Sequence, residues 1–131
     1  MNMNDVLKWI VDNRERVFDW GECDCCTFTC DFVKHMTGID PAEAHRGHYD
    51  TEIGAKRAIS KYGSVEDSFD KHFDRVTVNQ AMRGDAVLFN SEMGKTLGIK
   101  WSGGVLAITS DGVTLHDVSP DDIITVWRII E

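Results

Sequence analysis

No apolar run in this 131-residue sequence approaches the roughly 20 residues that a membrane-spanning helix needs. The first five residues also lack the basic stretch and apolar core of a secretory signal. Repeats, low-complexity tracts and linker-like segments are missing as well, and the chain contains only two prolines. We therefore expect one folded domain over residues 1–131, with no membrane partner and no secretory signal.

Positive charge is scarce. The chain has 14 Lys and Arg residues against 22 Asp and Glu residues, which gives a formal net charge of −8. Nucleic acids and anionic membranes are bound through basic patches, so the composition argues against both as partners. Solubility alone explains most of the acidity.

Cysteines are absent from most of the chain, because all four lie within the segment 23–30. A disulfide framework spreads its cysteines to close long loops, so we expect free thiols in a reducing compartment. A metal site is the alternative, but structural zinc sites use two separated Cys pairs, and no second pair exists here. His35, His45 or His48 would have to complete such a site. We assign no metal ligand and expect no cofactor, and a small metal-binding domain remains the third functional alternative.

The hydrophobic periodicity changes from helical to alternating near the middle of the chain, which predicts an α+β fold with helices first and strands second. The predicted helices cover residues 4–17, 24–36, 51–62 and 64–73. The predicted strands cover residues 75–78, 86–89, 104–109, 113–118 and 123–130, with residues 91–100 as a loop. Asp111-Gly112 between two β-rich runs predicts a hairpin.

Cys25 lies where the loop 18–22 meets the second predicted helix. Unpaired backbone N–H groups and the positive end of the helix dipole favour thiolate over thiol at such a position. The thiolate is the form that attacks carbonyl groups, so Cys25 is a candidate nucleophile. An inert cysteine that packs as a small apolar residue is the alternative interpretation.

The motifs around Cys25 carry a family resemblance. Asp24-Cys25, the strand 84–89 and the hairpin after it follow the order seen in NlpC-type cell-wall peptidases, where Asp-Cys-Ser-Gly-Phe precedes Gly-Asp-Leu-Val-Phe and then His-Val-Gly-Ile. The chain also resembles an uncharacterised family of bacterial and phage proteins distantly related to these enzymes. The motifs shared with that family occupy residues 20–25, 37–41, 46–49 and 83–85.

The resemblance implies a single NlpC-like domain with a papain-like fold, in which N-terminal helices pack on a C-terminal antiparallel sheet. When the His-Val-Gly-Ile strand of the NlpC-type enzymes is aligned with the predicted strand 104–108, its catalytic His falls on Gly104. The third catalytic position then falls on His116. Since residues 101–115 contain no His, His116 is the best available base for Cys25, with Asp117 or Asp85 orienting its ring.

Four further residues near the nucleophile are expected to contact the substrate: Trp20, Asp24, Cys26 and His48. The resemblance implies a phage-encoded, tail-associated protein that cleaves peptidoglycan amide bonds through Cys25. Its expected partners are other phage tail or virion proteins and peptidoglycan, and its expected location is the virion or the host cytoplasm during assembly. The alternative is a catalytically inactive virion structural or assembly protein with the same fold.

Overall fold

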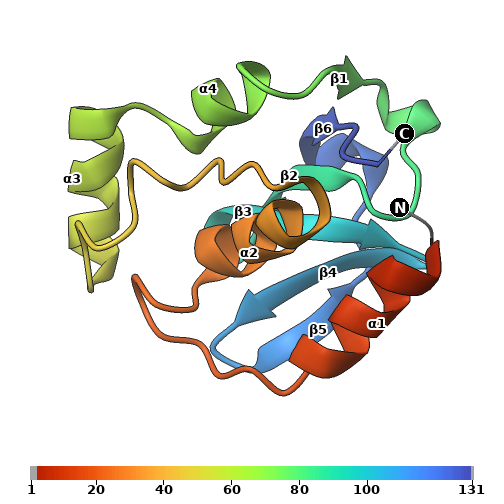
Figure 1. Ribbon diagram of the computed structural model, residues 1–131, viewed down its shortest axis with the longest axis horizontal. Helices are drawn as coiled ribbons and strands as arrows, with labels where there is room; N and C mark the ends of the chain where they lie inside the picture. The colour runs from red at the N-terminus through yellow and green to blue at the C-terminus, as the bar shows by residue number, and fades with distance from the viewer. Residues whose placement is uncertain (1–2, 131) are drawn as a thin grey trace.

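The computed structural model describes residues 3–130 and all of their side chains except that of Tyr62. Within this part of the chain the predicted α+β class is confirmed (Figure 1). The helices are α1 (Met3–Asn13), α2 (Cys25–Thr37), α3 (Glu52–Tyr62) and α4 (Val65–Asp70). The strands are β1 (Arg75–Val76), β2 (Ala86–Ser91), β3 (Gly94–Trp101), β4 (Gly104–Thr109), β5 (Gly112–His116) and β6 (Ile123–Trp127).

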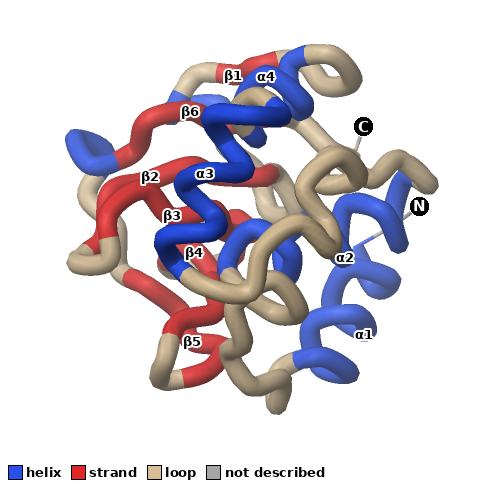
Figure 2. Tube along the Cα trace, turned by 90° about the vertical axis from the view of Figure 1, so that its left-hand side faces the viewer, coloured by secondary structure: helices blue, strands red, loops and turns tan. Residues whose placement is uncertain are grey.

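The six strands form one antiparallel sheet in the order β1-β6-β2-β3-β4-β5. Figure 2 shows α1 and α2 together on one side of the sheet. Helix α2 packs on the central strands β3 and β4. No helix among the described residues is long and apolar enough to cross a membrane.

The predicted starts of α2, α3 and α4 are confirmed, and each is preceded by a side chain that accepts a backbone N–H of the first turn. Helix α1 begins at Met3, one residue before its predicted start. Asp24 accepts from the Thr27 N–H at the start of α2, and Ser64 accepts from the Asp67 N–H at the start of α4. Gly38 ends α2 with a φ of 80°, a left-handed conformation that glycine adopts without a Cβ clash.

The prediction of a loop over residues 91–100 is wrong, because this segment forms most of β3. Gly94 and Gly98 weaken the strand signal there, although Leu97, Ile99 and Trp101 alternate with Gly98 and Lys100 as in a strand. Gly98 is required by packing rather than by a turn. A Cβ at this position would lie 2.5 Å from Val105 Cγ1 on the neighbouring strand.

Several predicted elements extend past the observed ends; α4 ends at Asp70, β5 at His116 and β6 at Trp127. Helix α1 ends at Asn13 rather than near Val17, because the Asn13 side chain donates to the Trp9 carbonyl and competes with the helix. Strand β1 ends at Val76, because Thr77 caps a short 3₁₀ turn over Val78–Gln80.

Apolar residues cover both faces of the sheet. The larger cluster joins the sheet to α1 and α2 and contains Trp9, Phe28, Phe32, Ile99 and Trp127. A smaller cluster on the opposite face contains Val87, Phe89, Val105, Ala107 and Val126. Which of the two faces a strand residue points to therefore decides whether it can approach α2.

Helix α4 is fastened to β6 by Asp70, whose carboxylate accepts from Arg75 Nε and from Trp127 Nε1 at 2.8 and 2.9 Å. These two hydrogen bonds lower the pKa of Asp70 from 3.8 to about 2, with the Arg75 bond as the larger cause. Because the folded-state pKa is depressed, the interaction stabilises the fold above about pH 4 and is lost as the pH falls towards 2.

We therefore expect Asp70→Asn to make stability less dependent on pH between about pH 4 and pH 2. The effect should be modest, since the Asp70 side chain is 38% exposed and water screens its ion pair. Urea midpoints of both proteins at several pH values in this range measure it. Asp121→Asn, at an exposed position, should leave the wild-type dependence unchanged. If the urea midpoint changed equally with pH in the wild type and in Asp70→Asn, Asp70 would not be the cause of the pH dependence.

Candidate functional site

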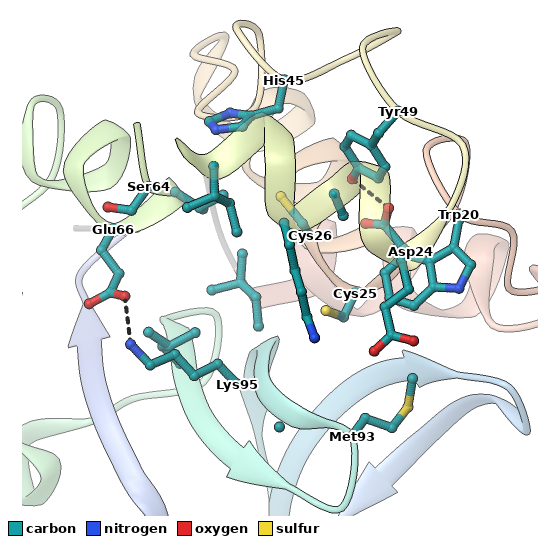
Figure 3. A pocket seen from close by; sticks show the side chains of 18 of the residues that line it. Trp20, Asp24, Cys25, Cys26, His45, Tyr49, Ser64, Glu66, Met93 and Lys95 are labelled. Carbon is teal, nitrogen blue, oxygen red and sulfur yellow. Dashed lines mark hydrogen bonds and ion pairs between the residues drawn. The ribbon is translucent and has the colours of Figure 1, made fainter. Parts of the chain in front are cut away.

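A pocket of about 520 Å³ lies beside the first turn of α2 (Figure 3). The loop before α2, helices α3 and α4, strands β2 and β3, and Trp127 form its walls. Its volume falls within the roughly 300–1,000 Å³ typical of small-molecule sites. The pocket is therefore the candidate functional site, and Cys25 lies on its wall as the sequence predicts.

Asp24 holds the residues around the pocket together. Its carboxylate accepts from the Thr27 N–H at 2.9 Å, from the Gly21 N–H at 3.0 Å and from the Tyr49 hydroxyl at 2.5 Å. The residue is 1% exposed, so these donors replace water around the charge. Asp24 therefore acts as the cap of α2 and the anchor of Tyr49. Burial, together with nearby Cys26 and Asp24, raises the pKa of Tyr49 well above its ordinary value.

Cys25 faces β3. The backbone of Leu97 hydrogen-bonds its thiol group, and the same residue's carbonyl accepts from the Thr29 hydroxyl at 3.2 Å. Burial raises the pKa of Cys25 from 9.0 to about 12, with Cys26 and Asp24 adding to the effect and the Leu97 bond opposing it. Desolvation of the thiolate thus exceeds the stabilisation that a helix start provides. The expectation that position favours the thiolate is therefore not met, and the group is a thiol at neutral pH.

The other three cysteines are also free thiols. Cys26 lines the pocket, and a hydrogen bond with Cys30 one helical turn away, together with burial, raises the pKa of Cys26 well above its ordinary value. Cys23 hydrogen-bonds Arg16 outside the pocket. Among the described residues, no three His, Cys, Asp or Glu side chains are arranged to hold a metal ion.

The structure does not bring His116 to Cys25. His116 pairs with Val105 in the β4–β5 register, and directly opposed residues of an antiparallel pair point to the same face. Val105 belongs to the cluster on the face away from α2, and the His116 ring lies 5.8 Å from Phe89 of that cluster. The prediction of a Cys25–His116 pair is corrected accordingly. Asp117 follows His116 and is exposed.

Gly104, the position on which the resemblance places the catalytic His, is the first residue of β4 and has no side chain. Polar Thr96 on β3 pairs with Phe89 and so faces away from α2, and its hydroxyl lies 2.7 Å from Ser91 Oγ. Neither residue supplies an imidazole to the pocket.

The family model of a domain of unknown function (DUF6950) matches residues 3–129. The chain belongs to this family. No curated protein matches the sequence. The family assignment covers both the pocket and the whole sheet, and it assigns no activity to them.

The remaining predicted contact residues divide between the pocket and the surface. Trp20 lines the pocket and packs edge-to-face on Phe18, with ring centroids 5.0 Å apart. Asp24 and Cys26 line it as well. His48 is exposed and lies outside the lining, so its contact with a substrate stays a prediction.

Sequence reasoning missed the role of His45. This residue lines the pocket, is 3% exposed and has Nε2 2.7 Å from the Gly63 carbonyl oxygen. Because a carbonyl only accepts, Nε2 carries the proton, and His45 ties its loop to the end of α3. Figure 3 shows the ring well separated from Cys25. No local pattern distinguishes His45 from His48, since the bond spans 18 positions of sequence.

Proposed function

We propose that this chain is a catalytically inactive domain of the NlpC type that acts as a docking component of a phage tail or virion. The observation that carries the proposal is the position of the His116 ring on the sheet face opposite to Cys25. A thiol hydrolase needs a base within hydrogen-bond reach of its sulfur. Among the described residues, His45 is the imidazole that lines the pocket, and it is well separated from Cys25 (Figure 3).

The state of the thiol supports the same proposal. A rise in the pKa of Cys25 from 9.0 to about 12 reduces its thiolate fraction at neutral pH by about a thousandfold. Catalytic cysteines show the opposite shift, because a neighbouring cation or imidazolium stabilises the thiolate. Cys25 therefore packs the junction between α2 and β3, and the pocket beside it provides a binding surface without chemistry.

The papain-like ancestry and the phage setting rest on the resemblance described above. The arrangement of a cysteine at the start of a helix that packs on an antiparallel sheet agrees with what that resemblance implies. We propose other tail or virion proteins as partners, with peptidoglycan as a ligand that is bound rather than cleaved. A metal-binding role receives no support from the described side chains.

The proposal predicts slow alkylation of Cys25. We expect its rate with iodoacetamide, followed by mass spectrometry of the Cys25 peptide, to rise about tenfold per pH unit from pH 7 to 10 without a plateau, because only the thiolate reacts. Glutathione under the same conditions is the control and should level off near its own pKa. We also expect no release of soluble fragments from purified peptidoglycan. A plateau below pH 8, or fragment release that Cys25→Ser abolishes, would overturn the proposal.

A further inference from the structure

The sheet ends in a strand whose outer edge is open. Strand β5 is the last in the sheet order, and it pairs with β4 over its whole length without a bulge. Among the described residues, the backbone of Gly112–His116 makes no backbone hydrogen bond outside this pairing. Natural sheets protect such edges with Lys, Pro, bulges or very short strands, and β5 has none of these. At the opposite edge of the sheet, β1 is only two residues long.

A close contact between β4 and β5 shows which backbone groups of β5 point outward. A Cβ on Gly104 of β4 would lie 2.2 Å from the His116 carbonyl oxygen, so His116 directs its backbone groups towards β4. The direction of these groups alternates along an antiparallel strand. The N–H and C=O groups of Val113 and Leu115 therefore point away from β4, where another strand could pair with them.

Helix α1 carries an apolar flank at the same end of the molecule. Both α1 and β5 lie at the lower end in the two views (Figure 1, Figure 2), and the loop after α1 lines a hollow together with residues 110–113. Trp9 packs on Phe28 of α2. Leu7 and Val11 are each two residues from Trp9, which is about 200° around the helix, so they point away from α2. They are 47% and 44% exposed.

The side chain of Leu115 lies on the same face of the sheet as α1. Leu115 pairs with Leu106, which packs against the cluster that includes Trp9, and directly opposed residues share a face. Leu115 is 48% exposed. Leu7, Val11 and Leu115 thus place exposed apolar surface beside the open strand edge, and such surface marks sites of protein–protein contact.

This surface carries little negative charge, although the chain has a net charge of −8. Asp5 and Asp12 of α1 lie within about 60° of Trp9 around the helix, on the flank away from the exposed apolar residues. Strand β5 itself contains no Asp or Glu, and Asp111 and Asp117 only flank it. Two copies of an acidic chain repel each other. The repulsion is weakest where they meet through this surface.

A second copy of the chain satisfies both features in one operation. A two-fold axis perpendicular to the sheet pairs β5 antiparallel with β5 of the second copy and keeps the helices of both copies on one side. The apolar flank of α1 then meets the same flank of the other copy, as in an isologous interface. Centring the pair on Leu115 sets Val113 opposite Asp117, whereas centring it on Thr114 would set Asp111 opposite Asp117. The first register avoids this like-charge contact.

We propose that two copies of this chain associate through the β5 edge and the Leu7–Val11 flank of α1, and so join their sheets into one. The Leu115 N–H of each copy donates to the Leu115 carbonyl oxygen of the other, and Leu7 and Val11 pack across the axis. The strand row is about 17 Å long and the helix row about 16 Å long. Contacts of this size lie at the low end of specific interfaces, so the dimer is reversible. The proposal goes beyond the docking function and does not involve Cys25.

Sedimentation equilibrium of the full chain over a range of concentrations tests the association. We expect a monomer–dimer equilibrium with a Kd of about 10–100 µM, as for other small interfaces. Leu115→Lys and Val11→Lys should each raise the Kd about tenfold or more, because association would bury the new charge. Ile124 of β6 and Ile53 of α3 are 39% and 65% exposed and serve as matched controls. Ile124→Lys and Ile53→Lys should change the Kd less than about twofold.

A cysteine at the axis tests the register. Opposed residues of a hydrogen-bonded antiparallel pair have Cα atoms about 5.5 Å apart, within the range of about 4.4–6.8 Å that a disulfide spans. We therefore expect diamide to convert most of Leu115→Cys into a covalent dimer, seen on a non-reducing gel. Ile124→Cys and the wild type, with its four native thiols, are the controls and should remain mostly monomeric.

Three results would each overturn the proposal. The first is a monomer at every concentration, and the second is an equal effect of the edge and control substitutions on the Kd. The third is equal cross-linking of Leu115→Cys and Ile124→Cys. Urea midpoints of the lysine variants close to the wild-type value show that a loss of dimer is not a loss of fold, and the cross-linking result stands without them.

Discussion

Replacing Asp24 by alanine is expected to destabilise the fold by about 3 kcal/mol, because it removes two kinds of interaction at once. Loss of a helix N-cap costs about 0.5–2 kcal/mol, and a buried donor left without an acceptor costs about 1–3 kcal/mol. Asp24 provides the cap of α2 and accepts from the Gly21 N–H and the Tyr49 hydroxyl. Urea unfolding of both proteins measures the difference.

Two variants control for the cap alone. Thr51 caps α3 through one hydrogen bond at an exposed position, so Thr51→Ala should cost about 1 kcal/mol. Asp24→Asn keeps one acceptor oxygen and should lie between the wild type and Asp24→Ala. If Asp24→Ala cost no more than Thr51→Ala, the contacts of the carboxylate with Gly21 and Tyr49 would not contribute to stability.

The same carboxylate connects folding to the pocket. The Tyr49 hydroxyl binds Asp24, and Tyr49 also packs against Gly54, where a Cβ would lie 3.1 Å from Tyr49 Cβ. Helix α3 carries Ile59 and so forms one wall of the pocket. Loss of Asp24 should therefore loosen this wall of the pocket as well as α2.

The elements that sequence reasoning located correctly are those with a local chemical signal. Asp24, Thr51 and Ser64 are caps whose acceptor lies within three residues of its donor. The turn between Thr109 and Gly112 is equally local, and the two residues pair as the Asp111-Gly112 signal predicts. Strand β3 has a weaker signal, because only Leu97, Ile99 and Trp101 alternate with Gly98 and Lys100, and the glycines favour a loop.

The candidate site was harder to predict because it depends on packing at long range. Alternation along a strand fixes which residues share a face, so His116 and Thr114 could be grouped from sequence alone. It does not fix which face α2 covers. Val105 and Ala107 lie on one face of β4, while Ile108 belongs to the cluster on the other, so both faces look buried. Only the docking of α2 on β3 decides between them.

Gly104, the position on which the resemblance places a catalytic His, has no room for a side chain. A Cβ at this position would lie 2.2 Å from the His116 carbonyl oxygen and 3.0 Å from its carbonyl carbon. Both are backbone atoms of the neighbouring strand, so no side-chain rotation relieves the overlap, and β4 must move away from β5. We expect Gly104→Ala to destabilise the fold by about 3 kcal/mol or more, at the upper end of overpacking, and Gly104→His to cost at least as much.

The adjacent glycine provides the matched control for this prediction. Gly103 has a φ of 83°, but the nearest atom to a Cβ there is Leu115 Cδ2 at 3.9 Å. Gly103→Ala should therefore cost only the strain of a left-handed backbone, about 1–2 kcal/mol. Thermal and urea unfolding of the two variants measure the difference. If Gly104→Ala were as stable as Gly103→Ala, the backbone of β5 would have to move away at His116 to make room for the new Cβ. A histidine side chain at residue 104 would then be compatible with the fold. If it is markedly less stable, the close approach of β4 and β5 itself excludes a side chain at that position.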